Sequence, residues 1–337
     1  MTGKPLRYRL TGAGVVLLLM GGLAACGGSG SAGQSGSGGL LKVKEGSIGG
    51  DISFEMQAVA DTQRIFEKQG LDVQDITTSS GVTATQALIA GQLDVVNAGG
   101  GEVLAALAKG ADIKIVAPLL NAFPYYLIGG KGIKSVSDIK GKSVAISTTG
   151  SSSYYGATTA LTALGLHRGD YKIQQVGGES DRLAAVASGS VAATVVGAQL
   201  IGKIKQLGLS VLSNLANAKI LFAQDYMVAS GAFIKAHPGF VAKYRKGLEQ
   251  ARAFMEDPAN KSETLAAFGK DFEVPASSGV AQAAYDYTQQ EKGSPLFFPP
   301  GLPLSKQVFQ HTMSVAGLSN SNLTLANVAA EGVPVAS

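Results

Sequence analysis

Several kinds of residue are scarce in this chain, and each scarcity removes a class of function. The 337 residues include no tryptophan, one cysteine (Cys26) and three histidines. A single cysteine cannot form a disulfide within the chain. His167, His237 and His311 lie far apart in the sequence, without acidic residues at metal-ligand spacing beside them. We therefore predict no metal site, no catalytic residues and no cofactor.

Charge is also sparse. Charged residues make up 15% of the chain and hydrophobic residues 45%, a proportion that permits a large buried core. The formal net charge is +4, and Lys4, Arg7 and Arg9 all lie in an N-terminal stretch without acidic residues. The rest of the chain is close to neutral and has no run of lysine or arginine. It lacks the electrostatic footprint of a nucleic-acid-binding protein, so we expect no nucleic acid as a partner.

The N-terminus has the pattern of a bacterial lipoprotein signal. Its basic residues precede an apolar stretch centred on 15–20, which is too short to span a bilayer comfortably. Leu23-Ala24-Ala25-Cys26 follows and resembles a lipobox, in which the chain is cut before a cysteine whose sulfur carries the lipid. We predict a signal peptide over 1–26 and a lipid anchor on Cys26, which holds the protein on the extracytoplasmic face of the cell membrane. An ordinary signal peptide with a chance cysteine and a short membrane anchor are the alternatives.

A linker and then a globular body follow Cys26. Residues 27–39 contain only Gly, Ser, Ala and Gln, a composition typical of a flexible tether. The longest later apolar candidate, 103–123, is interrupted by three charged residues, so it does not predict a membrane span.

The body alternates short apolar runs with helical patterns, which predicts an α/β fold with mostly parallel sheets. A capping-box pattern at Thr83 and Gln86 predicts the start of one helix. After residue 230 the pattern predicts helices only. The expected strands are 40–44, 71–77, 93–97, 113–118, 125–128, 143–147, 173–176, 193–196, 211–212 and 226–230. The expected helices are 53–68, 83–91, 102–109, 148–165, 181–188, 199–207, 238–255, 262–268, 280–290 and 305–316.

The loops that follow several of these strands are rich in Gly, Ser and Thr. In open parallel sheets ligands bind beyond the carboxyl ends of the strands, where loops enter helices. The amides and hydroxyls of 148–153 suit an anion such as a sulfonate or a carboxylate, and Asp51 is a candidate acceptor for a ligand amine. No arginine lies in these loops; Arg182, in an expected helix, is the nearest alternative. The predicted ligand contacts are Gly50, Asp51, Ser80, Gly81, Gly99, Gly100, Phe123, Tyr125, Thr148, Thr149, Gly150, Ser151, Ser152, Tyr154 and Gly197.

Each of these positions also has a structural interpretation. Asp51, Ser151 and Ser152 are suited to cap helices, and the glycines are suited to tight turns. The aromatic residues are more often part of a core than of a ligand site. Both interpretations stay open at this point.

Several segments of the body resemble the nitrate/sulfonate/taurine and thiamine-precursor class of ABC-importer binding proteins. The matching text lies in 81–94 (GVTATQALIAGQLD), 97–116 (NAGGGEVLAALAKGADIKIV), 137–145 (SDIKGKSVA) and 236–240 (AHPGF). Each piece alone is weakly specific, whereas their order and spacing together are specific.

The resemblance implies a periplasmic-binding-protein fold of type II, in which the chain crosses twice between two α/β lobes. One lobe would comprise 40–123 and 221–337, and the other 124–220. The crossings would fall near 123–124 and 221–222. A ligand would lie in the cleft between the lobes, and hinge closure would trap it.

The resemblance also implies a function: an extracytoplasmic, monomeric solute-binding lipoprotein that delivers a small molecule to an ABC permease and its ATPase. The hydroxyl-rich loop favours an anionic, sulfonate-like solute. One alternative is an enzyme like the thiamine-precursor synthase of the same fold, although that enzyme has a cysteine-rich segment and this chain has no cysteine after Cys26. A second alternative is a sensory or accessory lipoprotein that binds a solute without transport.

Overall fold

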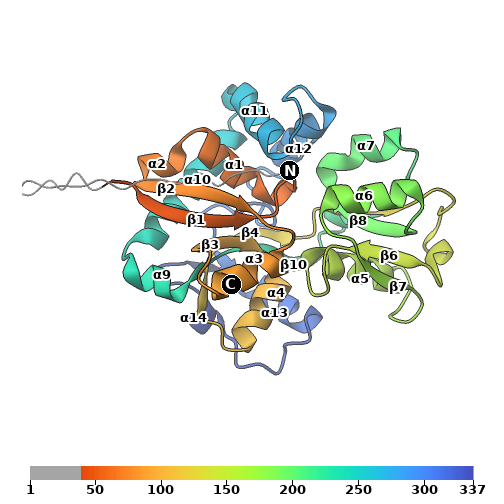
Figure 1. Ribbon diagram of the computed structural model, residues 1–337, viewed down its shortest axis with the longest axis horizontal. Helices are drawn as coiled ribbons and strands as arrows, with labels where there is room; N and C mark the ends of the chain where they lie inside the picture. Colours follow the sequence, from red (N-terminus) through yellow and green to blue (C-terminus); the bar gives the residue numbers. More distant parts are fainter. Residues whose placement is uncertain (1–38, 337) are drawn as a thin grey trace, which may run out of the picture. The chain divides into compact units, whose positions relative to one another are not determined.

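The computed structural model describes residues 39–336, which contain two five-stranded sheets (Figure 1). The predicted signal peptide, the lipidated Cys26 and most of the linker lie outside the described residues. Within 39–336, no helix is both long enough and apolar enough to cross a membrane.

The first sheet has one strand that runs against the other four. β10 pairs antiparallel with both of its neighbours, while β1 pairs parallel with β2 and β3. The central strands β3 and β10 are almost wholly buried because helices cover both of their faces. The strand order is β2 (Leu71–Thr77), β1 (Leu41–Ser47), β3 (Val95–Ala98), β10 (Leu221–Ser230) and β4 (Ile113–Ala122).

The second sheet repeats this plan. β5 pairs antiparallel with β8 and β9, and β6 pairs parallel with β7 and β8. In each sheet the odd strand, β5 or β10, is the first one that the chain enters after it leaves the other sheet. The strand order is β7 (Lys172–Gln175), β6 (Ser143–Ile146), β8 (Ala193–Gly197), β5 (Tyr125–Gly129) and β9 (Ser210–Asn214).

Helices from both ends of the described chain surround the first sheet, and the C-terminal helices return to it (Figure 1). α12 also packs against η3 and α7 beside the second sheet. The helices of the first sheet are η1 (Ile52–Phe54), α1 (Glu55–Thr62), α2 (Ile65–Lys68), α3 (Gly81–Ile89), α4 (Gly100–Ala108), α9 (Gly231–Ala236), α10 (Phe240–Glu256), η4 (Pro258–Asn260), α11 (Lys261–Asp271), α12 (Gly279–Gln290), α13 (Lys306–Val315) and α14 (Leu325–Val328). Those of the second are η2 (Val136–Ile139), α5 (Ser152–Ala163), α6 (Glu179–Ser188), η3 (Ala198–Leu200), α7 (Ile201–Gln206) and α8 (Leu215–Ala218).

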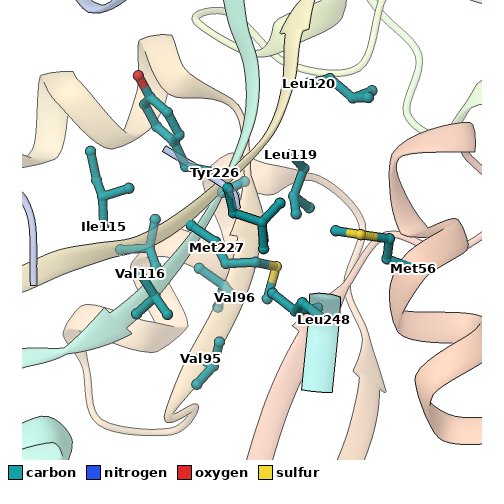
Figure 2. Packing of buried hydrophobic residues seen from close by; sticks show 14 of the residues in the cluster. Met56, Val95, Val96, Ile115, Val116, Leu119, Leu120, Tyr226, Met227 and Leu248 are labelled. Carbon is teal, nitrogen blue, oxygen red and sulfur yellow. The ribbon is translucent and has the colours of Figure 1, made fainter. Parts of the chain in front are cut away.

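Apolar side chains fill the space between each sheet and its helices. In the first sheet, Val96 and Met227 meet Met56 of α1 and Leu248 of α10 in one continuous core (Figure 2). The second sheet buries a separate cluster on each face, because neighbouring residues of a strand point to opposite sides. Val195 of β8 therefore belongs to one cluster and Val196 to the other.

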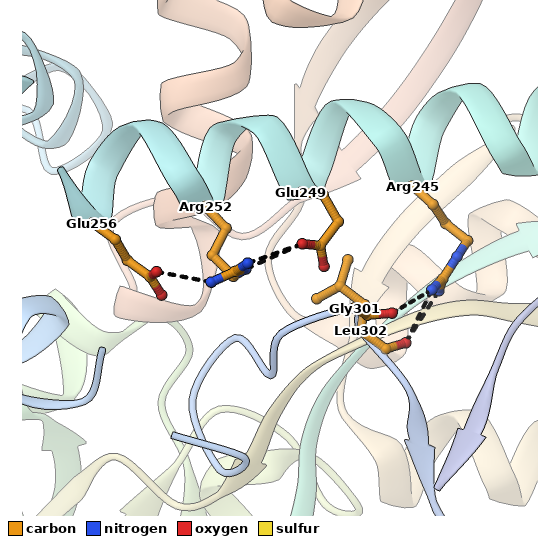
Figure 3. A network of polar contacts seen from close by, with 6 residues as sticks. All are labelled: Arg245, Glu249, Arg252, Glu256, Gly301 and Leu302. Atoms are coloured by element: carbon orange, nitrogen blue, oxygen red, sulfur yellow. Dashed lines mark hydrogen bonds and ion pairs between the residues drawn. The ribbon is translucent and has the colours of Figure 1, made fainter. Parts of the chain in front are cut away.

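Arg245 of α10 fastens the C-terminal segment to the first sheet. Its guanidinium donates to the carbonyl oxygen of Val116 at 2.7 Å. It also donates to the carbonyl oxygen of Gly301 at 2.8 Å (Figure 3). Further along the same helix, Arg252 pairs with Glu249 at 3.1 Å and with Glu256 at 2.8 Å. The contacts of Arg245 hold the loop before α13 against β4, so the C-terminal segment packs with the first sheet.

Three sequence expectations differ from the structure. The helix expected over 53–68 is broken after α1, because Arg64 adopts a left-handed conformation with φ of 52°. α3 begins earlier than expected, because Ser80 and not Thr83 is its N-cap and accepts from the Thr83 amide at 3.1 Å. The segment after 230 also contains a small parallel sheet of β11 (Leu304–Ser305) and β12 (Val335–Ala336), where we expected helices only.

The chain passes between the sheets at two places that lie side by side. One passage joins β4 to β5 through Phe123 and Pro124, and the other leads through α8 into β10. Leu221 pairs with Ala122 across β10 and β4, and the rings of Phe123 and Phe222 stack with centroids 4.5 Å apart. Both rings are almost completely buried.

We expect Phe222→Ala to lower the free energy of unfolding by about 3–5 kcal/mol, because it opens a cavity where the chain crosses between the sheets. Phe222→Leu keeps most of the volume and should cost less than about 1.5 kcal/mol. Urea unfolding followed by circular dichroism measures both variants. If Phe222→Leu is as unstable as Phe222→Ala, the aromatic contact matters more than the filled volume; if both variants are as stable as the wild-type chain, the prediction is contradicted.

Candidate functional site

A small cavity of about 40 Å³ lies where loops leave the carboxyl ends of β1, β3 and β6, between the two sheets. Its walls carry four carboxyl groups and one guanidinium. The lining residues are Ile48, Gly49, Asp51, Ser53, Gly81, Gly99, Glu102, Tyr125, Ser147, Ser151, Ser152, Ser153, Gly178, Glu179, Arg182, Gln224 and Asp225.

Glu102 is held at the start of α4 by glycine backbone. The Gly99 amide donates to Glu102 Oε1 at 2.7 Å, while Oε2 is buried and has no hydrogen-bond partner. A Cβ on Gly81 would lie 1.8 Å from Glu102 Oε1, so the carboxyl needs a glycine at this position. Because a glutamate at the third position of a helix accepts readily from the N-cap amide, the local sequence places this carboxyl at the cavity.

Asp51 occupies the loop after β1. Its Oδ1 accepts from the Ser53 amide at 3.0 Å and from the Ser53 hydroxyl at 2.9 Å, so the structural interpretation of Asp51 as a helix cap is confirmed for η1. Gly49 and Gly50 have positive φ values, which let the loop turn the carboxyl toward the cavity.

A group of serines brings the start of α5 to the opposite wall. Ser151 caps the helix through the Tyr154 amide at 3.3 Å. Ser152 reaches toward the first sheet, and its hydroxyl donates to the Gln224 carbonyl oxygen of β10 at 2.7 Å. A Cβ on Gly99 would lie 2.2 Å from Ser152 Oγ, so glycine permits this close approach of α4 and α5.

Glu179 and Arg182 of α6 form the third wall. The Glu179 carboxylate accepts from the Gly197 amide and, at 2.7 Å, from Gln199 Nε2. Arg182 donates to the carbonyl oxygens of Gly177 at 2.9 Å and Val195 at 3.3 Å. Much of the donor capacity of the guanidinium is thus used by the backbone, although its buried Nε has no partner.

Asp225 lies in the middle of β10, a strand whose other residues are mostly apolar. Its side chain is 4% exposed, and its Oδ2 has no hydrogen-bond partner. The side-chain amide of the preceding Gln224 donates through Nε2 to the Tyr125 hydroxyl oxygen. The buried Gln224 Oε1 is left without a hydrogen-bond donor. The cavity wall therefore presents several acceptors that lack donors.

Burial alters the protonation of these carboxyl groups. Burial raises the pKa of Glu102 to about 8, against a smaller opposing effect of its hydrogen bond from Gly99. Burial, followed by the charge of Asp51, raises the pKa of Glu179 to about 8 as well. The same causes, with Glu102 added, raise the pKa of Asp225 well above its ordinary value. Three carboxyls thus share a place where negative charge is poorly solvated.

The structure brings some of the predicted contacts to this cavity and leaves others elsewhere. Asp51, Gly81, Gly99, Tyr125, Ser151 and Ser152 line it. Of the remainder, Phe123 lies in the core, Ser80 is a buried helix cap, Gly100 packs on Ala223, Tyr154 packs at the edge of the core, and Gly197 donates to Glu179. Thr148, Thr149 and Gly150 precede α5 outside the lining, and Gly50 lines a neighbouring cavity. Direct contact of any of them with a solute stays a prediction.

The acidic part of the site escaped the sequence analysis. Glu102 is predicted only as the first residue of a helix, and no feature of the sequence singles out Glu179. A signal for Asp225 is visible in the sequence, because Gln224-Asp225 interrupts an otherwise apolar run at 221–230. A charged residue in a buried strand needs a functional or pairing reason.

A second, wider cavity of about 430 Å³ adjoins the first and shares Ile48 and Gly49 with it. It is also mainly acidic, with Lys270 as its one cationic lining residue. Its carboxyl groups belong to Glu45, Asp61, Asp75, Asp271 and Glu273. Within 39–336, no group of three or more His, Cys, Asp or Glu side chains is arranged to hold a metal ion.

Comparison with known proteins identifies the family. Residues 54–261 match the family described as NMT1/THI5 like, so the chain belongs to that family. A protein of Brucella abortus, named provisionally as a binding protein, is 27% identical over 217 residues, which cover 64% of this chain and 67% of the relative.

Solved structures confirm the predicted type II fold with two α/β lobes. The alkanesulfonate-binding protein of Xanthomonas axonopodis pv. citri, solved with bound MOPS, has a TM-score of 0.69 at 20% identity and covers 87% of this chain and 99% of its own. The periplasmic nitrate-binding protein of Synechocystis PCC 6803 has a TM-score of 0.61 at 15% identity, with 74% and 70% covered. At these identities the likeness describes the fold.

The raised carboxyl pKa values predict that the protein loses stability as pH rises. The folded state holds protons on Glu102 and Glu179 up to about pH 8, whereas the unfolded chain releases them near the model value of 4.5. Their stabilising effect is therefore complete below about pH 4.5 and is lost as pH rises through about 8. We expect Glu102→Gln to raise the free energy of unfolding at pH 8 by about 1–3 kcal/mol and to flatten this dependence.

The measurement is the melting temperature between about pH 5 and pH 9 for the wild-type chain and the variant. Glu331→Gln is the control, because Glu331 is exposed and lines neither cavity. A wild-type curve that rises over this range, or an equal change in both variants, would contradict the assignment of Glu102.

Proposed function

We propose that this protein is the solute-binding component of an ABC import system. It captures a small polar solute in the cavity between the two sheets and delivers it to a membrane permease. The observation that carries the proposal is the cavity itself, which polar groups from both sheets line at the carboxyl ends of the strands. Membership of the NMT1/THI5-like family and the likeness to sulfonate- and nitrate-binding proteins support it.

The paired crossings are the proposed hinge. In this proposal the protein has two lobes. One comprises residues 40–123 and 221–337, and the other comprises residues 124–220. Small backbone rotations at Phe123–Pro124 and around α8 would move α5 away from α4 and open the cavity. The hydrogen bond from Ser152 to the Gln224 carbonyl oxygen joins the two sides and would break on opening.

The sequence led us to expect a sulfonate-like solute because serines lie at the start of α5. Helix amides and hydroxyls at that wall suit an anionic group. The carboxyl groups on the other walls disfavour binding of a bare anion. We therefore propose a small polar solute and do not restrict it to sulfonates. No observation favours the enzyme or the sensory alternative: no cysteine or histidine is among the residues that line the cavity.

The first test is thermal unfolding of residues 39–337 against sulfonates, nitrate, amino acids, pyrimidines and amines, after refolding from denaturant to remove any solute that co-purifies. A solute at about a thousand times its dissociation constant should stabilise the fold by about 4 kcal/mol. A panel in which no solute changes the melting temperature would contradict the proposal.

The matched variants for this test are Ser151→Ala with Ser152→Ala, against Ser314→Ala on the exposed face of α13. Loss of the two cavity hydroxyls should weaken binding by about 1–2 kcal/mol, while Ser314→Ala should leave it unchanged. Unchanged affinity in the double variant would place the solute away from α5.

We also propose that Cys26 carries a lipid that tethers the protein to the extracytoplasmic face of the membrane. Cys26→Ser should prevent lipid attachment and leave the protein unanchored or unprocessed. Metabolic labelling with a radioactive fatty acid measures this, and incorporation into both chains equally would contradict it. The Gly- and Ser-rich residues 27–39 would serve as the tether.

A further inference from the structure

We propose that the solute held in the cavity is an organic cation, which donates N–H hydrogen bonds to Asp51, Glu102 and Asp225. This inference rests on the proposed function and names the chemical class of its solute.

The cavity wall becomes negative as its carboxyl groups ionise. Four carboxyl groups face one guanidinium, and that guanidinium, of Arg182, already donates to the carbonyl oxygens of Gly177 and Val195. A bare anion would enter a site where negative charge is already poorly solvated. An ammonium or amidinium group would instead be attracted by every carboxyl that ionises.

The unpartnered atoms are mainly acceptors. Glu102 Oε2, Asp225 Oδ2 and Gln224 Oε1 are buried without a hydrogen bond, and their residues are 8%, 4% and 1% exposed. Native proteins seldom leave such atoms unpaired, so these oxygens call for hydrogen-bond donors, which the N–H groups of an organic cation would supply. A quaternary ammonium ion lacks these donors, and Tyr125 is the only aromatic residue of the lining, which is less than an aromatic cage requires.

The spacing of the carboxyl groups favours an organic ion over a metal ion. Among residues 39–336, no three carboxyl or imidazole groups converge at metal-ligand geometry. The acidic side chains instead come from separate walls: the loop before η1, α4, α6 and β10. The adjoining wide cavity continues the acidic lining beyond Ile48 and Gly49, so an extended cation has room in that direction.

Protonation should couple to binding of such a cation. The pKa values of Glu102 and Glu179 near 8 mean that both groups carry protons at neutral pH, and a bound cation would displace them. Affinity for an amine is therefore expected to rise as pH increases from about 6 to 8, while the amine itself stays protonated. The titratable or charged groups that surround these carboxyls are Asp51, Tyr125, Tyr155, Arg182 and Asp225.

The experiment compares probes with a common butane backbone: butylamine, butane-1,4-diamine, 4-guanidinobutylamine and butane-1-sulfonate, with calcium and zinc chloride as inorganic cations. Calorimetry on residues 39–337 measures each affinity. We expect at least one amine to bind roughly tenfold or more tightly than the sulfonate, with release of protons near neutral pH.

Variants locate the bound cation. Glu102→Gln and Asp225→Asn should each weaken amine binding roughly tenfold or more. Glu331→Gln changes an exposed carboxyl group that lines neither cavity, and it should change the affinity less than about threefold. Melting temperatures of all three variants show whether they fold.

Several outcomes would overturn the inference. These are tighter binding of the sulfonate than of any amine, binding of calcium or zinc in place of amines, an equal change of affinity in Glu331→Gln and in the two cavity variants, or no binding of any amine up to about 10 mM. If no amine binds while another solute of the wider panel binds, the proposed solute-binding function is supported and the assignment of an organic cation is rejected. If nothing in either panel binds, both fail.

Discussion

The stacked rings of Phe123 and Phe222 are the contact on which the site depends. They join the two passages of the chain between the sheets, and Tyr155 of α5 packs on Phe222 with ring centroids 5.3 Å apart. This packing sets the start of α5 against the start of α4, where Gly99 and Gly101 leave room for Ser152 and Tyr155. The cavity is the space that remains between these two helix starts.

The same packing explains why the cavity is electrostatically unusual. Glu102, Glu179 and Asp225 are each compatible with their own element, at a helix start or within a strand. Brought together between two apolar cores, they lose water and share one region of low dielectric, which raises their pKa values. Buried acceptors without hydrogen-bond donors destabilise the folded state. Several of them at one cavity are therefore typical of a ligand-binding site.

Much of the fold was predictable from local patterns. The alternation of apolar runs and helical segments correctly placed the strands over 71–77 and 143–147 to within a residue, and the family resemblance identified the type II fold. Where prediction failed, a local conformation decided the outcome: Arg64 in a left-handed conformation breaks the first helix, and Ser80 caps α3 in place of Thr83. Backbone choices of this kind depend on packing that hydrophobic periodicity does not record.

The sequence by itself determined the α/β class, the family, the glycine- and serine-rich loops and the lipobox-like motif, because each of these is encoded in neighbouring residues. Only the tertiary structure decided which loops meet. It placed Asp51 and Asp225 in one cavity although they lie far apart in the chain, and it buried Phe123 in the core, where its ring stacks on Phe222. Burial and the mutual field of charges arise from contacts between distant segments, so the acidic character of the cavity could not be read from any one of them.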